Sequence, residues 1–162
     1  MAPCSHTPRA RGLVGYGAEV VPAPSSPQYG GASVDRIVPS LCGRTDADWL
    51  PEPVRGARTV VLLVLDGLGW ELLGAHAASL PELRALSGGA ITTVAPSTTA
   101  AALTSITTGL APTQHGVFGF RMKVDRAVLN VLRWTVDTGR PPDPVRVQRH
   151  QPFLARTVPV VT

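Results

Sequence analysis

The sequence has little of several features that mark particular protein classes. Only two of the 162 residues are cysteines, Cys4 and Cys42, and neither lies in a Cys-x-x-Cys pair or near a histidine at ligand spacing. We therefore predict free thiols in a reducing compartment and not a disulfide scaffold. No apolar run reaches the roughly 18 residues of a membrane-spanning helix, and glycines and a glutamate interrupt residues 13–21 where a signal peptide would be apolar. The cytoplasm is the expected location.

Charge is also scarce, since charged residues make up 16% of the chain and the formal net charge is +4. Of the fifteen basic residues only Lys123 is a lysine, and the arginines are scattered, not grouped in a run. No nucleic-acid partner is expected from this arrangement. A Walker A motif is missing as well, and Gly67, Gly69 and Gly74 do not have the spacing of the dinucleotide-binding fingerprint.

What the chain does contain is 44% apolar residues, together with sixteen glycines and sixteen prolines. This composition predicts one folded domain with many loops, not a disordered chain. Residues 1–33 are rich in proline, serine, glycine and alanine without a stable period, so we expect a flexible leader there. Residues 34–162 are expected to form the folded domain.

Apolar segments predict the strands of a parallel sheet. Residues 59–65 are β-branched and leucine-rich without alternation, which is typical of a strand buried on both faces, and residues 90–94 are a second candidate. Residues 158–161 are a third, and as an exposed strand they would allow self-association. Partial alternation at residues 117–134 favours a hairpin or strand pair.

Helices are predicted between these segments, at residues 70–78, 81–86 and 99–108. The last would be capped by Ser97 or Thr98 and would end at Gly109. The order of strands and helices predicts an α/β fold, with a sheet flanked by helices that this chain contains only in part.

Asp66 is the first candidate site residue, because it ends the uncharged segment at residues 59–65. Ligands of open α/β sheets bind at the carboxyl ends of the strands, where an aspartate can be a hard oxygen ligand for a divalent metal. The alternative is a turn aspartate that accepts hydrogen bonds from the amides of residues 67–69.

Thr99 is the second candidate, because it begins the predicted helix at residues 99–108. Free amides and the helix dipole favour an anion there, and a hydroxyl at that place can become a nucleophile if a metal lowers its pKa. The alternative is that Ser97, Thr98 and Thr99 only cap the helix.

Three motifs in order resemble the nucleotide pyrophosphatase/phosphodiesterase branch of the alkaline phosphatase superfamily. They are the apolar segment ending in Asp66-Gly67, the run Pro96-Ser97-Thr98-Thr99 before a helix ending in Thr108-Gly109, and the loop Pro112-Thr113-Gln114-His115-Gly116. Thr99 lies ten residues before Gly109 and three after Pro96, as in that family. The resemblance covers residues 59–121.

The resemblance implies the N-terminal part of an alkaline-phosphatase-like α/β domain that acts on phosphate esters or nucleotides. Asp66 and Thr99 would bind one of two zinc ions, and Thr99 would attack phosphorus and form a phospho-threonine. The family's phosphate-contacting asparagine falls on Ala102. The family's later ligands, an Asp-x-x-x-His pair, an Asp-His pair and a further histidine, have no counterpart at the required spacing among Asp125, Asp137, Asp143 and His150.

The expected function is therefore that of an N-terminal fragment of a metal-dependent phosphodiesterase or nucleotide pyrophosphatase, inactive as this chain alone. A non-catalytic α/β module that binds an anion or nucleotide at the helix beginning with Thr99 is one alternative. A truncated gene product without a stable fold is the other.

Overall fold

The computed structural model describes residues 25–45 and 47–161, and helices provide most of its regular structure. The helices are α1 (Ile37–Leu41), α2 (Glu52–Arg55), α3 (Trp70–Ala75), α4 (Pro81–Arg84), α5 (Thr99–Thr108), α6 (Pro112–His115) and α7 (Pro144–Val147). Three 3₁₀ turns accompany them, η1 (Val34–Arg36), η2 (Ala77–Ser79) and η3 (Pro152–Ala155). The strands are β1 (Arg121–Val124), β2 (Ala127–Asn130) and β3 (Thr135–Val136).

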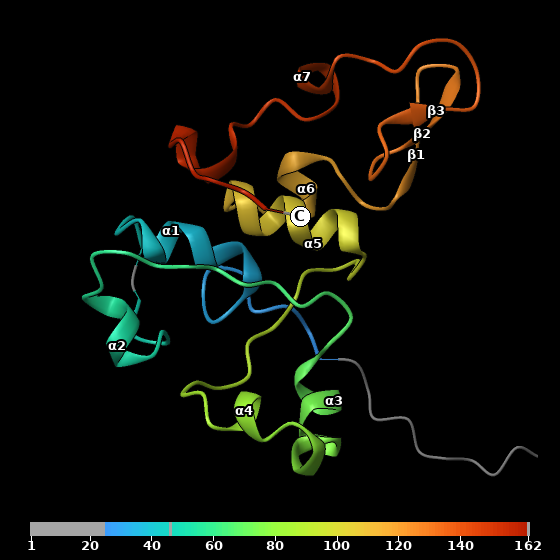
Figure 1. Ribbon diagram of the computed structural model, residues 1–162. Helices are drawn as coiled ribbons and strands as arrows, with labels where there is room; N and C mark the ends of the chain where they lie inside the picture. The colour runs from blue at the N-terminus through green and yellow to red at the C-terminus, as the bar shows by residue number, and fades with distance from the viewer. Residues whose placement is uncertain (1–24, 46, 162) are drawn as a thin grey trace, which may run out of the picture.

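Helix α5 lies at the centre of the structure, in contact with η1, α1, α6 and η3 (Figure 1). Its predicted bounds are confirmed. Thr98 caps the start through its side chain, and Gly109 ends the helix in the left-handed region with a φ of 73°. A Cβ atom on Gly109 would come within 2.5 Å of Pro39 Cγ, so this position requires glycine both for its backbone conformation and for the close approach of α1.

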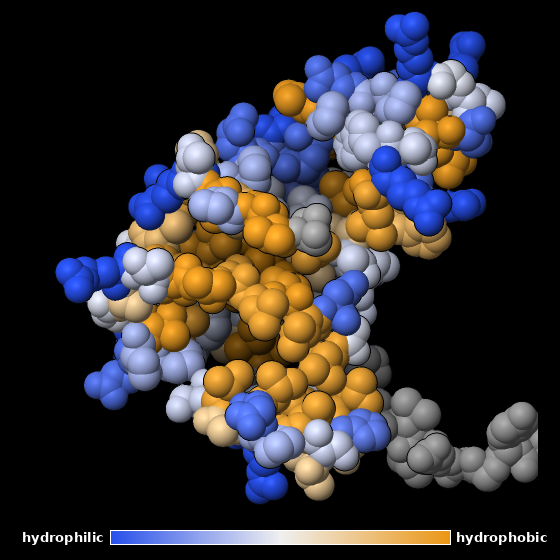
Figure 2. All heavy atoms as spheres, in the orientation of Figure 1, coloured by the Kyte–Doolittle hydropathy of each residue, from blue (hydrophilic) through white to orange (hydrophobic). Residues whose placement is uncertain are grey.

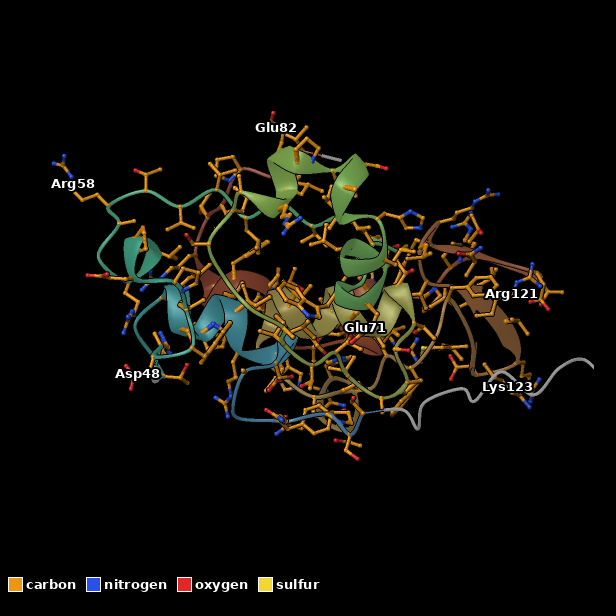
Figure 3. The ribbon with its side chains drawn as sticks, turned by 90° about the horizontal axis from the view of Figure 1, so that it is seen from below. Asp48, Arg58, Glu71, Glu82, Arg121 and Lys123 are labelled. Carbon is orange, nitrogen blue, oxygen red and sulfur yellow. The ribbon has the colours of Figure 1, made fainter. Side chains whose placement is uncertain are left out.

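Most of the buried apolar residues lie in α5 or close to it, and Leu129 lies in β2 of the small sheet. The buried apolar residues are Val38, Val94, Ala100, Ala101, Ile106, Val117 and Leu129. Arg58, Glu82 and Lys123 project from the periphery in Figure 3, as charged side chains do because their desolvation is costly. None of the helices in the described residues is long and apolar enough to cross a membrane.

The sheet is a three-stranded antiparallel meander in the order β1-β2-β3. Val124 pairs with Ala127, so Asp125 and Arg126 form a two-residue turn, with Asp125 at a φ of 54°. Aspartate tolerates this conformation better than most residues. The predicted hairpin at residues 117–134 is confirmed, and the combination of helices and a small sheet places the chain in the α/β class.

Two predicted strands of a parallel sheet are not strands in the described residues. Residues 59–65 belong to no helix or strand, and their side chains are exposed, Val61 by 88% and Leu63 by 72%. Residues 158–161 are likewise exposed and outside any strand. For residues 59–65 the prediction of burial was wrong, because a strand is buried on both faces only when neighbouring strands and covering helices surround it.

The predicted strand at residues 90–94 is reduced to a single parallel bridge between Thr92 and Ser33. The backbone N–H of Val34 donates to the carbonyl of Thr92, and that of Thr92 donates to the carbonyl of Ala32. Of the predicted leader, residues 1–24 lie outside the described residues. Its later part contacts the domain, since the Gln28 N–H donates to Thr92 Oγ1 and Ser33 is buried.

Figure 2 shows apolar side chains covering a continuous area of one face, where Figure 1 places α1, α5 and the chain that crosses in front of them. The exposed apolar residues 60–65 contribute to this area. Three of them, Val60, Val61 and Leu62, also line an open apolar cavity of about 270 Å³ with α1 and α2.

Candidate active site

Asp66 and Thr99 lie next to each other although they are 33 positions apart in the sequence. Thr99 Oγ1 donates a hydrogen bond of 2.9 Å to Asp66 Oδ2. Asp66 is exposed and Thr99 is half-buried, so a small ligand can reach both oxygen atoms from solvent. The carboxylate that could bind a metal and the hydroxyl that could attack a substrate therefore meet at one accessible point.

Helix α5 determines where the Thr99 hydroxyl lies. Thr99 is the first residue of this ten-residue helix, whose N-terminal end favours negative charge. Asp66 comes from a different element, the end of the extended segment at residues 59–65, immediately before Gly67 with a φ of 81°. Among the described residues, the hydrogen bond assigned to the Asp66 carboxylate comes from Thr99, not from the amides of residues 67–69.

Thr98 makes two hydrogen bonds at the start of α5. Its Oγ1 accepts a bond of 3.3 Å from the Ala101 N–H and donates one of 2.9 Å to the carbonyl of Phe118. The capping role predicted for Thr98 is therefore confirmed. The bond to Phe118, which joins the helix to the turn after α6, could not be read from the sequence because it spans twenty residues.

His115 is buried, with 2% of its surface exposed, and both ring nitrogens have partners. Nδ1 accepts a hydrogen bond of 3.1 Å from the Val117 N–H, so in the neutral ring Nε2 carries the proton and donates to Ser105 Oγ at 2.8 Å. Burial, and to a smaller extent the charge of His150, lower the pKa of His115 from its usual 6.5 to about 4.

The acidic residues in the turn of the hairpin and after β2 have other partners. Asp125 Oδ2 lies 3.7 Å from Arg146 in an exposed ion pair. Asp137 accepts a hydrogen bond from the Val128 N–H, and Asp143 caps α7 through the Val145 N–H. These contacts hold the hairpin and α7, and they do not bring a carboxylate to Asp66 and Thr99.

The donor set at Asp66 and Thr99 does not by itself complete a zinc site. Two oxygen atoms fall short of the three or four protein ligands that zinc takes. Among residues 25–45 and 47–161, no three histidine, cysteine, aspartate or glutamate side chains lie close enough to hold a metal ion together. Ala102, at the position where the resemblance implies an asparagine, is half-buried on α5 and offers no side-chain donor.

Comparisons with known proteins give one match. Residues 60–157 match the family model described as type I phosphodiesterase / nucleotide pyrophosphatase. Neither the comparison with curated proteins nor that with solved structures gives a significant match. The matched residues span more than half of the chain and include both Asp66 and Thr99.

Proposed function

Because this chain belongs to the type I phosphodiesterase / nucleotide pyrophosphatase family, we propose that Thr99 is the nucleophile of a metal-dependent hydrolase site and that Asp66 is one of its metal ligands. The observation that carries the proposal is the 2.9 Å hydrogen bond between Thr99 Oγ1 and Asp66 Oδ2 at the start of α5. The substrate class is a phosphate diester or a nucleotide pyrophosphate of small-molecule size.

The chemistry follows from the two side chains. Thr99 Oγ1 would form a bond to phosphorus while the bond to the leaving oxygen breaks, and the hydroxyl proton would pass to Asp66 Oδ2, which already accepts it as a hydrogen bond. The N-terminal end of α5 would stabilise the negative phosphoryl oxygens through its dipole. A zinc ion, when bound, would supply Lewis-acid charge for the attacking oxygen.

The 162-residue chain by itself is expected to have little or no activity, because the described residues provide only two of the ligand oxygens. Hydrolysis of bis(p-nitrophenyl) phosphate, with and without added zinc, tests this. We expect no zinc-dependent rate above background. Zinc-dependent hydrolysis that is lost in Thr99→Ala but kept in Thr107→Ala, on the same helix, would contradict the inactivity and support the nucleophile.

Measurements of phosphate or nucleotide binding distinguish the proposed hydrolase site from a non-catalytic anion-binding module. The proposed hydrolase site predicts that zinc strengthens the binding of inorganic phosphate or a nucleotide and that Asp66→Ala removes the gain. Calorimetric titration of the chain with phosphate, in zinc and in chelator, gives the comparison. Binding that persists in chelator and is unchanged in Asp66→Ala would favour the binding module, whose only requirement is the start of α5.

A further inference from the structure

The hydrogen bonds around α5 carry an inference beyond the two candidate site residues. We propose that Thr98 and His115 are positioning residues for Thr99: a hydrogen-bonded connection through the turn at residues 115–118 holds the start of α5, and with it the Thr99 hydroxyl, in place. The proposal rests on the proposed role of Thr99 as the nucleophile.

The first link lies beside Thr99. Thr98 uses one hydroxyl for two bonds, accepting from the Ala101 N–H inside α5 and donating to the carbonyl of Phe118 outside it. The hydroxyl therefore joins the first turn of the helix to the turn after α6. Because Thr99 is the next residue in the chain, a shift of Thr98 changes the direction of the Thr99 side chain.

The second link fixes the turn to which Thr98 is bonded. His115 accepts from the Val117 N–H at Nδ1 and donates to Ser105 Oγ from Nε2. Ser105, His115 and Val117 are all buried, so losing either bond would leave an unpaired polar group away from water. Burial keeps the ring neutral, which the acceptor role of Nδ1 requires.

The two links together attach the turn to α5 at two places. Thr98 and Ser105 are seven residues apart, roughly two helical turns, so the turn at residues 115–118 spans much of the helix. Gly116 makes this geometry accessible, since its φ of 79° reverses the chain between His115 and Val117. Because α5 is held at both places, its first turn does not fray. The Thr99 hydroxyl at the start of the helix therefore keeps its orientation.

The test is the rotamer of Thr99 in the full 162-residue chain, measured by NMR from its Hα–Hβ coupling, with amide hydrogen exchange at Ala101. Thr98→Val keeps the shape and removes the hydroxyl, and Thr98→Ser keeps the hydroxyl. We expect Thr98→Val to average the Thr99 coupling and to accelerate exchange at Ala101 by about fivefold to tenfold, as loss of a helix cap does. Thr98→Ser should restore both values.

The matched control is Thr107→Val, because within the described part of the chain the Thr107 hydroxyl donates to carbonyls inside α5. It should leave the Thr99 coupling unchanged. If Thr98→Val behaves like Thr107→Val, the positioning role is overturned. Ser105→Ala tests the second link, since it removes the partner of His115 Nε2. A Thr99 coupling that stays unaveraged in Ser105→Ala would overturn the part of the proposal that concerns His115.

These outcomes are separate from those of the proposed function. The rotamer of Thr99 is measured without metal or substrate, so the positioning claim stands or falls on the variants above. Zinc added to the unsubstituted chain tests the site itself, through chemical-shift changes at Asp66 and Thr99. Absence of those changes would count against the proposed function and leave the result on positioning intact.

Discussion

The two residues of the candidate site come from regions that are packed very differently. Thr99 lies in residues 98–118, where α5 and α6 contain buried apolar residues and the buried pair Ser105 and His115. Asp66 lies in residues 52–90, all of which the structure describes and none of which is buried. Thr99 is therefore held by a packed framework, whereas Asp66 lies in an exposed region and its side chain accepts a hydrogen bond from Thr99. Packing alone would let Asp66 move more than Thr99.

The same truncation in each region should show the largest contrast. Ile106→Ala removes a buried side chain of α5 and should lower the free energy of unfolding by about 3 kcal/mol, because it leaves a cavity. Val61→Ala, on a side chain that is 88% exposed, should change it by less than about 0.5 kcal/mol. Urea denaturation followed by circular dichroism measures both. Equal losses would show that residues 59–65 are buried in solution.

Glycine substitutions sharpen the comparison within residues 98–118. Gly109→Ala should lower the free energy of unfolding by about 2–3 kcal/mol. The alanine would be strained in a left-handed backbone, and its Cβ atom would lie 2.5 Å from Pro39 Cγ. Gly116→Ala has a similar φ of 79° but open space around the Cβ position, so it should cost only about 1 kcal/mol. Thermal unfolding of the two variants gives the difference. If Gly116→Ala proves as damaging as Gly109→Ala, the close approach of α1 is not what requires glycine.

Mild acid should lower the folding stability of residues 98–118, because His115 is buried as a neutral ring. The folded-state pKa of about 4 lies below the unfolded value of 6.5, so the unfolded chain takes up the proton first. The stabilisation from the neutral ring is present above pH 6.5 and is lost as the pH falls from 6.5 towards 4. Through His115, the free energy of unfolding can fall by up to about 1.4 kcal/mol for each pH unit in this range.

Denaturant unfolding at several pH values measures this pH dependence, and two variants assign it. His115→Gln should flatten the pH dependence between pH 6.5 and 4, whereas His76→Gln, on an exposed side chain, should leave it as in the unsubstituted chain. A pH dependence as steep in His115→Gln as in the unsubstituted chain would contradict the buried neutral ring.

The parts of the fold that were predicted correctly are those determined by nearby residues. The bounds of α5 follow from Thr98 and Gly109, and the hairpin follows from the alternation on either side of Asp125. The exposure of residues 59–65 could not be predicted, because an apolar run shows that a segment favours burial but not whether partners surround it.

The sequence named Asp66 and Thr99 as candidate site residues, but it did not reveal the hydrogen bonds that surround them. The resemblance identified Asp66 and Thr99, and the structure places their side chains in contact. The bonds from Thr98 to Phe118 and from His115 to Ser105 were missed, since each joins residues ten or twenty positions apart and depends on how α6 folds back on α5. The spacing of Ser105 and His115 on either side of Gly109 is the one signal that could have indicated a pair.

The most direct test of the central claim is a zinc titration of the ¹³C-labelled chain, followed at the Asp66 carboxyl carbon and the Thr99 side chain. We predict that zinc shifts both resonances together, that Asp66→Asn abolishes the shift at Thr99, and that Glu82→Gln, at the periphery in Figure 3, does not. A zinc-induced change that is confined to other residues, or that persists at Thr99 in Asp66→Asn, would contradict a shared metal site of Asp66 and Thr99.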